Sequence, residues 1–222
     1  MEIVTSMTLS ESTKVIPQTI TNKVNCMVFV DDGLLINKFK IKVGFVTIND
    51  NPILNEIALD QIDLFFKLLM DNCIIMSKDL YDKTINPFDN NIFMVHEKPN
   101  DQVIASMIFL KLVNIVGENL GIEYVSLTSN LGNKICYTID MNSAEIEVLL
   151  PTNHDWWKDK NIKFDPWWLR SDTASYDLLI NRDEIYKGEF LWEDYFKDDL
   201  KEADDFNKPK GKFKLIPGGK NE

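Results

Sequence analysis

Arginine, histidine and cysteine are scarce in this chain of 222 residues, and each scarcity argues against a class of protein. The basic side chains are 22 lysines and only two arginines, against 35 acidic residues, so the formal net charge is −11. Proteins that read nucleic acids gather cations on one face and favour arginine for bidentate contacts. We therefore expect no direct binding of DNA or RNA. Three cysteines without regular spacing are not the framework of a disulfide-rich secreted domain.

Long apolar runs are also absent from the sequence. None approaches the roughly 18 uncharged apolar residues of a membrane span, and the run from Leu64 to Met76 is broken by Lys67, Asp71 and Asn72. The first residues lack the basic and apolar regions of a signal peptide. We expect a soluble protein without a membrane partner, in the reducing cytoplasm of its own or a host cell. The abundance of Asn, Ile and Lys is typical of AT-rich genomes and suggests a bacteriophage virion or accessory component as one origin.

The apolar content, 45 % of the chain, is enough for a folded core. Residues 1–150 are interpreted as one α+β domain, a mostly antiparallel sheet carrying two long helices. A Trp-rich and acidic extension follows over 151–206, and 207–222 is expected to be a flexible tail rich in Lys, Gly and Pro.

Local patterns predict the elements of that domain. Asp31-Asp32-Gly33 is a turn signal within a hairpin over 23–48, whose return strand alternates apolar residues with lysines. Asn51 and Asn100 are helix caps for helices over about 52–71 and 101–119, and Gly121 is taken as the stop of the second. The remaining expectations are strands over 1–10, 91–95 and 145–150, a loop over 78–91, a hairpin over 122–129 and 134–140, and a short helix through Ile180.

Tryptophan is concentrated in the extension, where Trp156, Trp157, Trp167 and Trp168 fall within thirteen residues. Such rings pack a loop onto a core, form hot spots of protein interfaces, or stack on sugars. The sugar hypothesis adds Asp155 and Asp165 as polar partners, either for binding or for cleaving a glycan. Further along, Leu191, Trp192, Tyr195, Phe196 and Leu200 form one stripe of an acidic helix, which docks either on a partner or on the protein's own sheet.

The segment Gln61-Ile62-Asp63-Leu64-Phe65 resembles the pentapeptide by which many bacterial replication and repair proteins bind the sliding clamp. In such peptides the Gln makes polar contacts and the Leu-Phe pair fills an apolar pocket. That resemblance implies an adaptor that binds a replication clamp. The same residues lie at helical spacing within an amphipathic helix, which predicts core packing instead.

Catalytic signatures are missing from the sequence. His96-Glu97 and His154-Asp155 are sequence neighbours, and neighbouring strand side chains point to opposite faces. There is no phosphate-binding loop and no zinc-ligand spacing. The Pro87, Asp89, Glu97 and Lys98 set does not fit a nuclease, because Glu97 and Lys98 are adjacent. Cys26, Cys73 and Cys136 lie in apolar contexts and are expected to be buried and inert.

The sequence thus predicts a non-catalytic protein-interaction or assembly protein, without a cofactor or metal, that binds a protein partner or a second copy of itself. The residues predicted to make that contact are Trp156, Trp157, Trp167, Trp168, Trp192 and Phe196.

Overall fold

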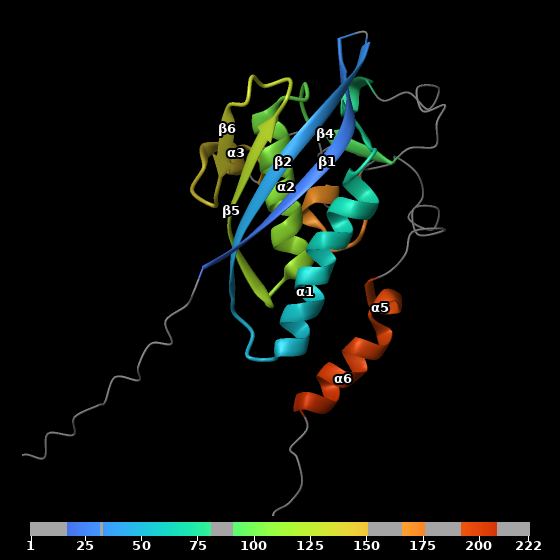
Figure 1. Cartoon of the computed structure of the whole chain (residues 1–222), viewed down its shortest axis with the longest axis vertical. Coiled ribbons are helices and arrows are strands. Elements are labelled where there is room, and N and C mark those ends of the chain that lie inside the picture. The colour runs from blue at the N-terminus through green and yellow to red at the C-terminus, as the bar shows by residue number, and fades with distance from the viewer. Residues whose placement is uncertain (1–16, 32, 81–90, 151–165, 176–191, 208–222) are drawn as a thin grey trace, which may run out of the picture.

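The computed structural model describes residues 17–31, 33–80, 91–150, 166–175 and 192–207 (Figure 1). Its fold is mixed α/β around a six-stranded sheet of order β4-β3-β1-β2-β5-β6. The pairs β1–β2, β2–β5 and β5–β6 are antiparallel, as the sequence predicts, whereas β1–β3 and β3–β4 are parallel. The strands are β1 (Gln18–Val30), β2 (Gly33–Thr47), β3 (Ile74–Ser77), β4 (Ile92–Val95), β5 (Leu120–Ser129) and β6 (Cys136–Ile139). The helices are α1 (Pro52–Leu64), α2 (Asp101–Val116), α3 (Ala144–Leu149), α5 (Trp192–Tyr195) and α6 (Lys197–Asn207), with the short turns η1 (Phe65–Met70), η2 (Lys78–Leu80) and η5 (Trp167–Leu169).

The long hairpin β1–β2 confirms the predicted one and begins earlier, at Gln18. Its register pairs Val30 with Gly33, and Asp31 has φ +53°, the left-handed conformation that tight hairpin turns require. Figure 1 shows that the turn projects beyond the rest of the sheet. The hairpin therefore has a body that belongs to the sheet and an end that extends past it.

Helix α1 begins as predicted. The Asn51 side chain accepts a hydrogen bond from the Ile53 N–H at 3.0 Å, and Pro52 occupies the first turn. The chain then widens into the π-helical turn η1, so helical structure extends to Met70. Strand β3 begins a few residues later, at Ile74, and was not predicted from the sequence. A four-residue run buried on both faces has no alternation to distinguish it from the apolar end of a helix.

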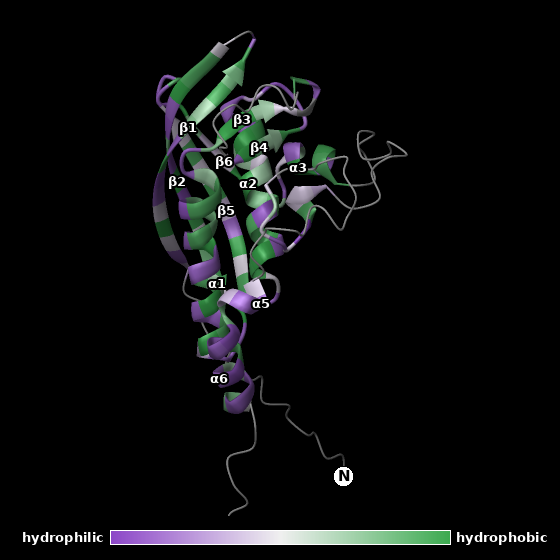
Figure 2. Cartoon of the chain, turned by 90° about the vertical axis from the view of Figure 1, so that its right-hand side faces the viewer, coloured by the Kyte–Doolittle hydropathy of each residue, from purple (hydrophilic) through white to green (hydrophobic). Residues whose placement is uncertain are grey.

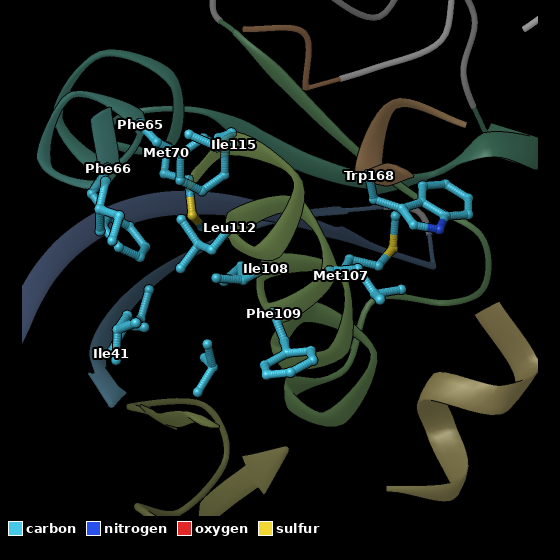
Figure 3. Packing of buried hydrophobic residues seen from close by; sticks show 14 of the residues in the cluster. Ile41, Phe65, Phe66, Met70, Met107, Ile108, Phe109, Leu112, Ile115 and Trp168 are labelled. Carbon is cyan, nitrogen blue, oxygen red and sulfur yellow. The ribbon is translucent and has the colours of Figure 1, made fainter. Parts of the chain in front are cut away.

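Helix α2 also begins as predicted, because the Asn100 side chain accepts from the Val103 N–H at 2.9 Å. The predicted stop at Gly121 is wrong, since Gly121 lies in β5 and the helix ends at Gly117 with φ +53°. The buried residues of α2 extend nearly all round the helix. In Figure 3, Phe109 and Leu112 lie on the side of α2 nearer Ile41 of the sheet, and Trp168 lies on its other side.

The strand predicted over 145–150 is wrong, because these residues form most of α3. Its buried residues, Ile146 and Leu149, are three apart, which is a helical spacing, and not two apart as a strand requires. Glu145 and Glu147 lie in its first turn, where the helix dipole favours negative charge.

The two parts of the C-terminal region that are described pack onto this core. Residues of 166–175 and 192–207 belong to the same buried cluster as α1, α2 and one face of the sheet. A smaller cluster, Ile74, Met76, Ile92 and Met94 with Met27 and Phe29, lies on the opposite face of β1, β3 and β4. Several predicted elements lie outside the described residues: the strand over 1–10, most of the loop over 78–91, the part of the next helix from 176 to Ile180, and the tail over 207–222 except Asn207, which ends α6.

Candidate functional site

The second tryptophan pair lies inside the core. Trp167 and Trp168 are fully buried, and Trp167 donates its indole N–H to the Met94 carbonyl at 2.8 Å. The Trp167 ring meets Phe93 edge-on at 4.7 Å between centroids. A ring with no exposed area offers nothing to a partner in this conformation, so the observed role of both residues is packing.

A buried lysine holds this tryptophan turn in place. Lys111 of α2 is fully buried, and its Nζ donates to the carbonyls of Trp167 and Arg170, each at 2.9 Å. It also lies 3.3 Å from Asp172 Oδ1 and 5.6 Å from the Trp167 ring centroid. A charge taken out of water needs such partners. These contacts could not be predicted from the sequence, where Lys111 is a lone cation in an apolar helix and its partners lie more than fifty residues away.

The aromatic stripe of the acidic helix also packs mainly against the core. Trp192 and Phe196 are buried, with rings stacked at 6.3 Å, and the Trp192 indole donates to the Ser171 carbonyl at 2.7 Å. Tyr195 remains exposed. Helix α6 is tied to α1 by the Asn51 side chain, which donates to the Ala203 carbonyl at 3.2 Å. The remaining predicted site residues, Trp156 and Trp157, lie outside the described part of the chain, as do His154, Asp155 and Asp165.

The clamp-like segment spans the end of α1 and the start of η1. Ile62 and Phe65 are fully buried, and Leu64 is half-buried against the main core. Binding through the Leu-Phe pair would require this part of the helix to leave the core. Clamp binding therefore stays a prediction that the folded conformation does not favour.

A pocket of about 200 Å³ opens beside the start of α2. His96, Glu97, Gln102, Ser106 and Glu145 supply its polar groups. His96 Nε2 lies 3.7 Å from Glu97 Oε1, too far for a hydrogen bond, and Ser106 donates to the Gln102 backbone carbonyl at 2.9 Å within its own helix. Gln102 also donates to Glu145. The contacts described here do not assemble a nucleophile with a base, and the described part of the chain holds no group of three metal-ligating side chains.

The thiols depart from expectation at one position. Cys26 and Cys73 are buried and 3.7 Å apart at sulfur, and burial raises the pKa of Cys73 well above its ordinary value. Cys136, in contrast, is exposed on β6, so its expected burial is wrong. An edge strand with one face open to solvent explains the difference.

The surface feature that sequence reasoning missed is the apolar end of the β1–β2 hairpin. Leu34, Leu35 and Ile36 follow the turn directly and expose 38 %, 46 % and 77 % of their area. Leu131 and Ile135 of the β5–β6 turn are exposed as well, and that turn is bound to the same end because Asn37 Oδ1 accepts from the Leu131 N–H at 3.2 Å. We call these five residues the apolar hairpin end. Figure 2 shows the projecting strands coloured as hydrophobic, apart from the turn.

A signal for this feature was present in the sequence. The return strand alternates lysines with apolar residues from Lys38 to Val43, but Leu34, Leu35 and Ile36, just before Asn37, are three apolar residues in a row. In a strand, such a run exposes aliphatic side chains on at least one face unless both faces are covered.

Lysines occupy the next part of the sheet face that carries Leu34 and Ile36. Lys23, Lys38, Lys40 and Lys42 are exposed, and the register places Lys23 directly opposite Lys40. Within the described residues none of the four forms an ion pair. The net charge of −11 does not reveal this local strip of lysines.

No family model and no curated protein matches the chain. Within the described residues, no helix combines the length and apolar character needed to cross a membrane.

Proposed function

We propose that this is a non-catalytic assembly protein that associates with a second copy of itself through the apolar hairpin end. The observation that carries the proposal is the grouping of Leu34, Leu35 and Ile36 on the stretch of β2 beyond the end of β5, next to the projecting hairpin turn. Aliphatic side chains exposed singly are normal, whereas a contiguous exposed apolar group is typical of contact surfaces.

The Trp-rich region has a supporting role in this proposal. Trp167 fastens 166–175 to β4, and Trp192 fastens 192–207 to 166–175, so in this proposal they stabilise the scaffold instead of contacting the partner. We keep the cytoplasm of the source or host cell as the proposed location, and a phage virion or accessory component as the proposed origin.

The test is the absolute mass in solution, measured by size-exclusion chromatography with light scattering from low to high micromolar concentration. We expect the mass to rise above the 25.7 kDa of one chain as the concentration increases. A triple variant, Leu34→Thr, Leu35→Thr and Ile36→Thr, should stay monomeric, because threonine keeps the strand propensity but removes the apolar area.

The matched control is Ile48→Thr, which removes a 59 % exposed aliphatic side chain just beyond the other end of β2. It should associate as the native protein does. A native protein that remains monomeric throughout the range, or a triple variant that associates normally, contradicts the proposal.

A further inference from the structure

The edge of β2 is unoccupied by any other described strand over the apolar hairpin end. Strand β5 pairs with β2 only from Phe39 to Thr47. The next position is taken by the β5–β6 turn, since the Lys38 carbonyl accepts from the Asn130 N–H at 3.2 Å. Leu34 and Ile36 therefore lie on a stretch of edge that no described residue pairs with.

The backbone groups of Leu34 and Ile36 point outward from the hairpin. On β1, the Asn25 and Met27 N–H groups donate away from β2, to Asp71 and Cys73. The even-numbered residues of β1 therefore face β2, and the register pairs Val28 with Leu35. On β2 the even-numbered residues consequently face the free edge, which agrees with the contact between Lys38 and Asn130. Each copy thus presents two N–H and two C=O groups at this edge.

We infer that two copies pair antiparallel at this edge, around a two-fold axis at Leu35, and so join their sheets; this inference rests on the proposed function. Leu34 of one copy then lies opposite Ile36 of the other, and the four groups of each copy form four hydrogen bonds that leave none unpaired. A register shifted to Ile36 would place Leu34 opposite Lys38, whose backbone N–H and carbonyl are already bonded to Asn37 and Asn130. Of these two registers, the one centred on Leu35 pairs all the edge groups of Leu34 and Ile36 in both copies.

The side chains support a pairing that is reversible. Native proteins protect free edges with charges, prolines or bulges, and the residues from Gly33 to Ile36 carry none of these. The five residues of the apolar hairpin end expose between 38 % and 77 % of their area, which amounts to roughly 250 Å² per copy at about 100 Å² a side chain. A stable complex buries about 800 Å² per partner, so we expect a dimer that depends on concentration.

Cysteine crosslinking tests the register, in a Cys136→Ser background that removes the exposed thiol. In the inferred dimer, Leu35 faces its own counterpart as a non-hydrogen-bonded pair with Cα atoms about 4.5 Å apart, within the reach of a disulfide. Leu35→Cys should therefore give a dimer under mild oxidation that a reductant dissolves. The matched control is Ile36→Cys, whose counterpart lies about 8 Å away along the diagonal, beyond that reach.

Ile36→Pro tests the backbone bonds. Its N–H faces the edge and not β1, so proline removes an edge donor without breaking the ladder of the hairpin. We expect a variant that keeps its circular dichroism spectrum and unfolding midpoint but no longer dimerises. Should proline perturb the fold, the crosslinking pair still decides the register.

The outcomes separate the two proposals. Association of the native protein, with selective crosslinking at Leu35→Cys, supports the pairing. Association with equal crosslinking at both positions, or association that Ile36→Pro leaves intact in a folded protein, overturns the edge pairing while the proposed function stands. A native protein that is monomeric at every concentration overturns both.

Discussion

The buried ammonium of Lys111 gives the sharpest stability prediction, and Lys111→Met is the change that isolates it. Methionine keeps an unbranched chain of similar length, so the packing against α2 is largely retained while the charge and its donors are lost. The carbonyls of Trp167 and Arg170, each 2.9 Å from Nζ, then lose the ammonium as a donor, while the Trp167 carbonyl still accepts from the Arg170 N–H at 3.2 Å. Asp172 keeps its contact with Arg170 at 2.9 Å.

Two opposing terms set the size of the effect. A hydrogen bond to a charged group contributes about 1.5–3 kcal/mol, and the ammonium donates two of them to carbonyls. The substitution also relieves the cost of keeping a charge out of water. Because breaking a buried charged contact from one side costs about 3–5 kcal/mol, we expect the free energy of unfolding to fall by about 3 kcal/mol.

Equilibrium unfolding in urea, followed by tryptophan fluorescence, measures this loss. With a slope of about 2–3 kcal/mol per molar for a chain of this size, the midpoint should fall by about 1 M. The matched control is Lys67→Met, which should leave the midpoint unchanged because Lys67 of η1 pairs with Asp63 of α1 at the protein surface. If Lys111→Met unfolds at the native midpoint or above it, the free energy of burying the ammonium is at least as large as the stabilisation from its contacts. That result would contradict the prediction.

Further expectations concern thiols, a helix cap and a buried carboxyl. In the native protein a thiol reagent should label Cys136 rapidly and leave Cys73 unreacted until denaturant is added; rapid labelling of Cys73 would contradict its burial. Asn51→Ala should lower the free energy of unfolding by more than the ~1 kcal/mol of a lost cap, because Asn51 also donates to the Ala203 carbonyl. Asn51→Asp should recover the cap alone. Equal losses in the two variants would argue against a contribution from the bond to Ala203. Burial raises the pKa of Asp101, so the folded state holds this proton more tightly than the unfolded state, and stability falls as pH rises from the ordinary carboxyl pKa through the raised one. Unfolding midpoints of Asp101→Asn should lack this fall, and a parallel pH profile for both proteins would rule out the assignment.

Local sequence signals predicted most individual elements correctly. The Asp-Gly turn specified the long hairpin, and Asn51 and Asn100 marked the starts of α1 and α2. These predictions hold because turn and cap preferences act within a few residues, through backbone conformation and single hydrogen bonds. The strand predicted over 145–150 is wrong because Ile146 and Leu149 are buried together, and their spacing fits one face of a helix.

Local residue patterns are enough to predict the long hairpin and the starts of α1 and α2. The parallel pairing of β3 and β4, the inward placement of Trp167, Trp168 and Trp192, and the burial of Lys111 come instead from contacts between distant segments. The same contacts leave Leu34, Leu35 and Ile36 exposed where no other described strand pairs with β2 on its outer edge. Whether an apolar side chain is core or surface depends on what other segments cover it, and that coverage is set by contacts between residues far apart in the chain.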